Sequence, residues 1–111
     1  MSLERVKQFK DLNIDFDISG SGNVTVAFWT DMPGGTMSSR KSVTYTATTG
    51  RVTKTIPLDG IEGTLMKLVV TPATGTVCRL YAATVRLRPV GVYLDGTVGD
   101  IWQTLEIGFG I

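Results

Sequence analysis

The sequence predicts an all-β protein, an antiparallel β-sandwich of jelly-roll or immunoglobulin-like type with about eight short strands. Three observations lead to this prediction. Apolar and polar residues alternate with a period of two along most of the chain, and turn signals rich in glycine and proline separate these runs. No run between two strands has the helical period that a parallel βαβ crossover requires.

The chain has 111 residues, of which 42% are hydrophobic, and this is the length and composition of one folded domain. We expect a single β-sandwich domain over residues 12–111, preceded by an N-terminal arm or short helix over residues 1–11. The helix is an alternative because Leu3, Val6 and Phe9 recur at about helical spacing.

The first two strands give the clearest signals, over residues 13–18 and 23–30. Each run places apolar side chains on one face and mainly polar side chains on the other. The apolar set comprises Ile14, Phe16, Ile18, Val24, Val26 and Phe28, and the opposite set comprises Asn13, Asp15, Asp17, Thr25, Ala27 and Trp29. Because only Gly20-Ser21-Gly22 separates the two runs, we predict a β-hairpin between them.

The middle of the chain contains three further predicted strands. After a loop over residues 31–35, residues 41–48 alternate, and a short strand over 52–56 ends in the turn residues 57–60. Residues 64–71 are apolar on both faces. Such a run indicates a central strand covered above and below, or a strand covered by a neighbouring subunit.

The last part of the chain contains the longest run, residues 77–88. Strict alternation there places Val77, Arg79, Tyr81, Ala83, Val85 and Leu87 on one face, and Cys78, Leu80, Ala82, Thr84, Arg86 and Arg88 on the other. Pro89 ends this strand, and a short strand over 90–94 and a last strand over 101–109 follow. From these runs we predict a core that includes Ile14, Phe16, Val26, Phe28, Val69 and Leu80.

The composition argues against an enzyme. Histidine is absent, which removes the commonest general base and metal ligand, and one cysteine cannot supply a zinc site. Carboxylate pairs remain, and the candidates are Asp15 with Asp17, Glu62, and Asp95 with Asp100. Asp15 and Asp17 share one strand face, so we interpret them as solvating groups or as partners for lysine or arginine. We expect no catalytic residue, no cofactor and no metal.

Residues 15–20 have the oxygen spacing and the glycine with which an EF-hand calcium loop starts. The twelfth position of that loop requires a glutamate, and here it is Val26. The EF-hand match therefore fails, and a weak calcium site that uses Asp15 and Asp17 is the remaining alternative.

Charge and hydropathy limit the partners. The 11 basic and 10 acidic residues give a net charge of +1, so we expect no nucleic-acid partner. No apolar run approaches the roughly 18 residues of a membrane span, and the first residues lack the apolar region of a signal peptide. The single cysteine, Cys78, excludes an internal disulfide, suits a reducing cytoplasm, and is interpreted as a buried apolar residue.

Basic and aromatic residues allow more than one interpretation. The basic residues have three alternative interpretations: a basic patch, an ordinary solvated sheet surface, or part of a protein interface, where arginine is favoured. They are Arg40, Lys41, Arg51, Lys54, Arg79, Arg86 and Arg88. We rank the interface above phosphate binding. The aromatic residues Trp29, Tyr45, Tyr81, Tyr93 and Trp102 are interpreted as core or interface, and the alternative is a sugar-stacking platform in a carbohydrate-binding β-sandwich module.

Both ends of the chain are apolar enough to dock against another surface. Residues 95–111 combine four glycines with apolar side chains, and an apolar end is stable when it adds to a sheet edge of its own domain or of a neighbour. The predicted interface residues are Leu3, Val6, Phe9, Trp102, Leu105, Ile107, Phe109 and Ile111. The alternative is that both ends complete the core of their own domain.

Several turn and strand signatures resemble those of a known class of proteins. Asp31-Met32-Pro33-Gly34-Gly35 follows a strand that ends in Phe28-Trp29-Thr30. Later segments are Thr48-Thr49-Gly50-Arg51, Ile56-Pro57-Leu58-Asp59-Gly60, Arg79-Leu80-Tyr81 and Arg86-Leu87-Arg88-Pro89-Val90-Gly91-Val92-Tyr93. Together they resemble small β-sandwich modules of tailed-phage virion proteins, over most of the chain from about residue 10 onward.

This resemblance carries no catalytic residues. It implies a non-enzymatic structural protein of a bacteriophage virion, present in many copies on the tail or the head shell. The expected partners are other virion proteins and further copies of the chain in a homo-oligomer. The protein is then made in the host cytoplasm and found in the virion.

Overall fold

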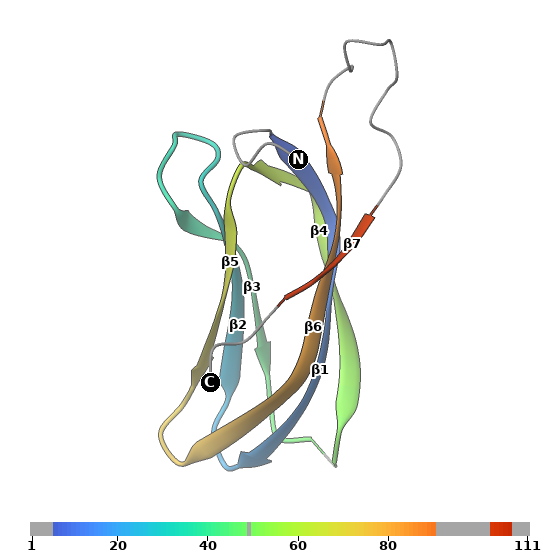
Figure 1. Cartoon of the computed structure of the whole chain (residues 1–111). Helices are drawn as coiled ribbons and strands as arrows, with labels where there is room; N and C mark the ends of the chain where they lie inside the picture. Colours follow the sequence, from blue (N-terminus) through green and yellow to red (C-terminus); the bar gives the residue numbers. More distant parts are fainter. Residues whose placement is uncertain (1–5, 49, 91–102, 108–111) are drawn as a thin grey trace.

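Two antiparallel sheets pack face to face in the computed structural model, which describes residues 6–48, 50–90 and 103–107 (Figure 1). Its strands are β1 (Lys7–Gly20), β2 (Val24–Thr30), β3 (Ser38–Tyr45), β4 (Val52–Gly63), β5 (Met66–Pro72), β6 (Thr76–Pro89) and β7 (Gln103–Glu106). Sheet A has the strand order β4-β1-β6-β7, and sheet B has the order β3-β2-β5. The predicted all-β sandwich is confirmed, and the described residues contain no helix.

The core lies between the two sheets and comes from alternate residues of the strands. Its members are Phe9, Leu12, Ile14, Phe16, Ile18, Val24, Val26, Phe28, Ile56, Leu58, Ala83, Val85 and Leu87. Phe9 of sheet A and Phe28 of sheet B meet edge to face across the core, with 5.1 Å between their ring centroids. This contact joins the two layers near one end of the sandwich.

The faces predicted for the first two strands are confirmed, but the predicted hairpin is wrong. β1 pairs with β4 and β6, whereas β2 pairs with β3 and β5, so the two strands lie in opposite sheets. A hairpin and an arch between sheets need the same local pattern, because each strand buries one apolar face in both cases. The link over residues 21–23 therefore does not distinguish them.

The predicted core is confirmed at four of its six positions. Ile14, Phe16, Val26 and Phe28 are each at most 3% exposed. Leu80 is half-buried and packs against the core. The prediction is wrong for Val69, which is half-buried on the outer face of sheet B, because its neighbours Leu68 and Val70 face the core instead.

β4 and β5 differ from the prediction. β4 continues through Pro57 to Gly63, because the positive φ angles of Asp59 and Gly60 (52° and 79°) form a bulge within the strand and not a turn that ends it. β5, with apolar residues on both faces, is an edge strand of sheet B. The central-strand interpretation of this segment is therefore wrong.

The strict alternation predicted for β6 breaks at Tyr81. Asp15 pairs with Ala82 and Phe16 pairs with Leu80, so one extra residue of β6 bulges out between them. Beyond the bulge the inward residues change from even to odd numbers. As a result all three arginines of β6, Arg79, Arg86 and Arg88, lie on the outer face of sheet A.

The two ends of the chain are described only in part. β1 begins at Lys7, so residues 7–11 belong to the sheet and do not form an arm or helix; the residues before Val6 lie outside the described range. Of the last predicted strand, 103–106 form β7 along the edge of β6. The strand predicted over 90–94 lies outside the described range apart from Val90, which is not in a strand.

Candidate interaction surfaces

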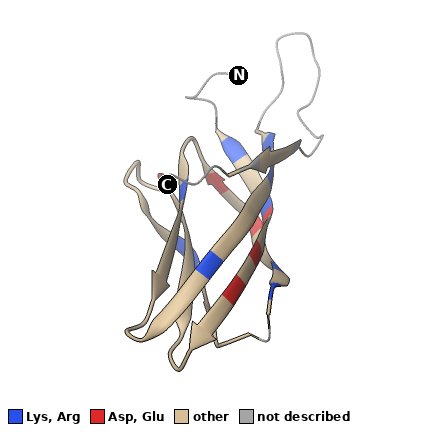
Figure 2. Ribbon diagram, turned by 60° about the horizontal axis from the view of Figure 1, so that its bottom comes forward, with Lys and Arg blue, Asp and Glu red and all other residues tan. Residues whose placement is uncertain are grey.

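The outer face of sheet A is polar, and two ion pairs between residues far apart in the sequence lie on it. Arg86 on β6 donates from Nε to Asp11 Oδ1 on β1 at 2.8 Å, and its Nη2 contacts the other carboxylate oxygen. Arg51 donates from Nε to both oxygens of Asp15, at 2.8 and 2.9 Å, and its guanidinium lies 4.3 Å from the Tyr81 ring centroid. Acidic and basic bands therefore stand side by side on this sheet (Figure 2).

These pairs decide between the interpretations of Asp15 and of the basic residues. Asp15 is a partner for arginine, as one of our interpretations predicted. Arg88 donates to Gln8 Oε1 at 3.0 and 2.8 Å, and Arg40 donates to the carbonyl oxygens of Pro33 and Thr36. Much of the positive charge is thus engaged inside the domain.

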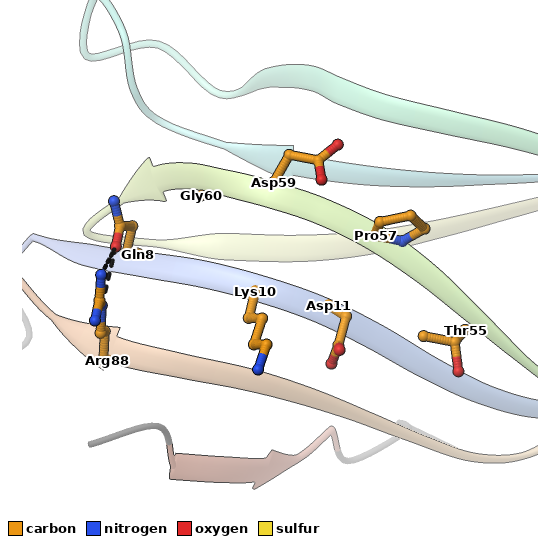
Figure 3. Close-up of a pocket in the computed structure, with 8 residues that line it drawn as sticks. All are labelled: Gln8, Lys10, Asp11, Thr55, Pro57, Asp59, Gly60 and Arg88. Atoms are coloured by element: carbon orange, nitrogen blue, oxygen red, sulfur yellow. Dashed lines mark hydrogen bonds between the residues drawn. The ribbon is translucent and has the colours of Figure 1, made fainter. Parts of the chain in front are cut away.

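A shallow depression of about 440 Å³ lies on this face, where two bulges open the spacing between β1 and β4 (Figure 3). Its lining residues are Gln8, Lys10, Asp11, Thr55, Pro57, Asp59, Gly60 and Arg88. Pairing jumps from Phe9 with Ile61 to Asp11 with Pro57, and this jump creates the space. In Figure 3, Lys10 and Asp11 point toward β6 while Asp59 points to the other side, so the charged groups do not converge on one position.

Asp31 connects the end of β2 to the turn between β4 and β5. Its Oδ1 accepts the backbone N–H groups of Thr64 at 2.8 Å and Leu65 at 3.2 Å, and its Oδ2 accepts the Thr64 hydroxyl. The buried Lys7 donates from Nζ to the Thr64 carbonyl at 2.9 Å. Sequence reasoning placed Asp31 only in a loop, because its partners are 33 and 34 positions away. These contacts hold the start of β5.

The three aspartates with partners have pKa values below the ordinary range. A hydrogen bond from Arg86 lowers the pKa of Asp11, and a hydrogen bond from Arg51 lowers that of Asp15. The hydroxyl of Thr64, followed by the N–H groups of Leu65 and Thr64, lowers the pKa of Asp31. Each carboxylate is therefore stabilised in its ionised form by the folded structure.

These lowered pKa values predict a loss of stability in acid. A group whose pKa is lower in the folded state stabilises the protein fully above its unfolded pKa, near 4, and this stabilisation disappears as the pH falls through the folded value. We expect the free energy of unfolding, measured with urea, to change little between pH 7 and 5 and to fall below about pH 4.

The variant Asp31→Asn provides the control for this acid dependence. It keeps an oxygen acceptor for the two N–H groups but cannot ionise, so its free energy of unfolding should fall less below about pH 4 than that of the unchanged chain. An equal fall in both proteins would show that Asp31 does not contribute.

Most edges of the two sheets carry features that hinder the addition of another strand. β4 contains Pro57 and the bulge at 58–60. β3 contains a bulge, and its Lys41 pairs with the core residue Phe28, so a charge faces inward there. The described part of β7 has 4 residues. The part of β6 before Ala83 has no described neighbour on its β7 side, and the bulge at Tyr81 interrupts it. Bulges, prolines, inward charges and short strands are the usual protections of a sheet edge.

Among the described strands, β5 is the edge without these protections, and no described strand pairs with its free side. It pairs with β2 in unbroken register over Met66–Pro72, and its proline stands only at the last position. Leu68 and Val70 pack against the core, Val69 lies half-buried on the outer face, and Lys67 is its single charged residue. A regular and mostly apolar edge of this kind is a template for pairing with another strand.

Two exposed leucines lie on the side of the sandwich where β5 is open. Leu65, immediately before β5, is 54% exposed. Leu105 of β7 is opposite the buried Val85 and so points inward, yet it is 50% exposed. β5 of sheet B contacts β6 of sheet A, and β7 is the next strand beyond β6 in sheet A. A strand added to the free side of β5 would therefore extend sheet B in the direction of β7 and Leu105.

The predicted interface residues are found in different places. Phe9 is 1% exposed in the core, so it cannot contact a neighbour; its position in a strand, and not in an arm, is the reason. Val6 is half-buried and accepts the N–H of Val90, and Ile107 packs against the core. Leu105 is the exposed member of the set. Leu3, Trp102, Phe109 and Ile111 lie outside the described residues.

The three described aromatic residues from the proposed sugar platform do not share a surface. Trp29 lies on the outer face of sheet B, where the Lys67 ammonium is 4.5 Å from its ring centroid. Tyr81 lies on the outer face of sheet A, and Tyr45 packs against Phe16. Tyr93 and Trp102 are outside the described range.

Chemically reactive groups are few in the described chain. Cys78 is half-buried, and burial, with a smaller effect of Asp17, raises the pKa of its thiol, so the reactive thiolate is disfavoured. No group of three metal-ligating side chains occurs within residues 6–48, 50–90 and 103–107. The same residues include no helix that could cross a membrane.

No protein-family model matches this chain, and no curated protein or solved structure matches it significantly.

Proposed function

We propose that this chain is a non-enzymatic structural protein of a bacteriophage virion, which assembles in many copies on the tail or the head shell. The observation that carries the assembly part of the proposal is the open edge of β5. Among the described strands, the other edges are protected by bulges, inward charge or short length, and β5 is the regular edge left open. Such an edge favours the addition of a strand from a protein partner.

The chemistry of the other surface supports a structural role over catalysis. Two ion pairs on the outer face of sheet A, Asp11 with Arg86 and Asp15 with Arg51, engage charges within the domain. The side chains around the depression on this face do not converge. A polar, internally paired face keeps the subunit soluble, while the opposite sheet provides the edge for contact.

The assignment to a virion rests on the resemblance of the turn and strand signatures to small modules of tailed-phage proteins. Within that proposal the partners are other virion proteins and other copies of this chain. The protein is made in the host cytoplasm and incorporated into the particle there.

Mass spectrometry of gradient-purified particles from the organism that encodes the chain tests this function. We expect the protein to co-sediment with intact particles, at a copy number comparable to that of the repeated tail or capsid subunits. An abundant host cytoplasmic protein serves as the control for carry-over. Recovery of the chain only from particle-free fractions would contradict the proposal.

A further inference from the structure

We infer that the open edge of β5 binds β5 of a second copy, antiparallel and centred on Val69, so that the B sheets of two copies form one continuous sheet. This inference rests on the proposed assembly function and names its partner. The contact is isologous, with the same strand on both sides of a two-fold axis, and it closes as a dimer.

The partner follows from a comparison of the edges. β4 is protected by a bulge and Pro57, and β3 by a bulge and the inward-facing Lys41. The free stretch of β6 contains a bulge, and the described part of β7 is short. Among the described strands only β5 of another copy offers a regular edge of matching length. Pairing of β5 with any other described edge would meet a bulge, an inward charge or a much shorter strand.

The backbone of β5 has the donors and acceptors that this pairing needs. Ala73 donates its N–H to Asn23 across the end of the β2–β5 pair, at 2.8 Å. In an antiparallel pair, every second residue bonds to the same neighbouring strand, so Val69, four positions before Ala73, also bonds to β2. Leu68 and Val70, which alternate with Val69, therefore present their N–H and C=O groups to the open side. Pro72, which has no N–H, also faces the open side, at the end of the strand.

The side chains of β5 fit this register. Val69 is the midpoint of Met66–Pro72, so centring on it pairs the whole strand, with Leu68 opposite Val70 of the second copy. Lys67, the only charge, then lies opposite Thr71 of the second copy. A register centred on Lys67 would instead place two like charges opposite each other, which is unfavourable.

A disulfide trap tests the register. In the antiparallel pair the two Val69 residues form a non-hydrogen-bonded pair, with Cα atoms about 4.5 Å apart, within disulfide range. In a Cys78→Ala background, Val69→Cys should form a covalent dimer on mild oxidation, seen by non-reducing electrophoresis. Lys67→Cys, on the same strand face, should form no covalent dimer, because the two Lys67 positions are not opposite each other in this register. Cross-linking of the second variant and not the first would overturn the register.

Charge variants at Thr71 test the same contact without a covalent bond. Thr71→Glu places a carboxylate opposite Lys67 of the second copy, and each cross-strand ion pair occurs twice in the dimer. By sedimentation equilibrium we expect dimerisation to tighten roughly 2- to 30-fold, and Thr71→Lys to weaken it by a similar factor. Thr44→Glu and Thr44→Lys, exposed on the far strand β3, make the same changes in net charge and should leave the dimer constant unaltered.

The outcomes separate this inference from the proposed function. If the chain is found in particles but the Thr71 and Val69 variants behave like their controls, the β5–β5 contact is wrong and the structural function stands. If the chain is monomeric at high concentration and also absent from particles, both are wrong. Thermal unfolding of each variant shows whether the domain itself stays folded.

Discussion

Replacement of Phe28 by alanine is expected to lower the free energy of unfolding by about 3–5 kcal/mol. Phe28 is 1% exposed and belongs to the core, so its removal loses buried apolar surface and leaves a cavity. It also loses the edge-to-face contact with Phe9 at 5.1 Å, which connects the two sheets.

Urea unfolding at pH 7 measures this loss, and Val77→Ala is the matched control. Val77 is 54% exposed on the outer face of sheet A, so its truncation should change the free energy of unfolding by less than about 0.5 kcal/mol. A loss below about 1 kcal/mol for Phe28→Ala would contradict the packing of the two sheets described above.

Replacement of Gly20 by alanine should be similarly damaging, by about 2–5 kcal/mol, from overpacking and an unfavourable φ together. Gly20 ends β1 with φ 110°, opposite Thr76. A Cβ there would lie 2.3 Å from the Gly75 carbonyl oxygen and 2.9 Å from the Thr76 Cα. Because these are backbone atoms, the pairing of β1 with the start of β6 must shift to make room.

Gly75→Ala separates the two causes. Gly75 also has a positive φ, 80°, but its Cβ would meet no atom within 4 Å. It should therefore cost only the conformational penalty of about 1–2 kcal/mol. Urea unfolding of both variants should show a clearly larger loss for Gly20→Ala, and equal losses would mean that the close approach at Gly20 is relieved without cost.

The internal positions of β1 and β2 could be predicted because alternation is a local property. Ile14, Phe16, Val26 and Phe28 are buried as the period of two required, and their neighbours Asp15 and Trp29 lie on the outer faces. The β-sandwich followed from many such runs with turn signals between them. No knowledge of the partner strands was needed for these results.

The period was misleading where the backbone has bulges. Tyr81 in β6 and the 58–60 segment of β4 each insert residues that no partner faces, and a bulge shifts the alternation of everything beyond it. Strict counting therefore placed Arg79 on a different face from Arg86 and Arg88. In β4, the turn residues 57–60 predicted an end of the strand where the structure has a bulge. A bulge is stabilised by its pairing partners, which local sequence does not specify.

The candidate surfaces were the least predictable feature. The pair Asp11–Arg86 joins residues 75 positions apart, and the contacts of Asp31 with the β4–β5 turn span 33 and 34 positions. No spacing rule connects residues at such distances along a chain. The apolar run of β5 predicted a central strand or a strand covered by a neighbouring subunit, and the sequence did not reveal that β5 is an edge strand of sheet B.

The sequence alone therefore determined the fold class, the faces of the regular strands, and the lack of histidine and of a second cysteine. These depend on residue identity and on a period of two, and both are local. The tertiary structure decided that β1 and β2 lie in different sheets, that Phe9 is core, and that β5 is an open edge among the described strands. Strand order depends on backbone hydrogen bonds between strands. Because nearly every residue carries the same backbone donor and acceptor, these bonds alone do not select which strands pair. The packing of the whole chain makes that selection.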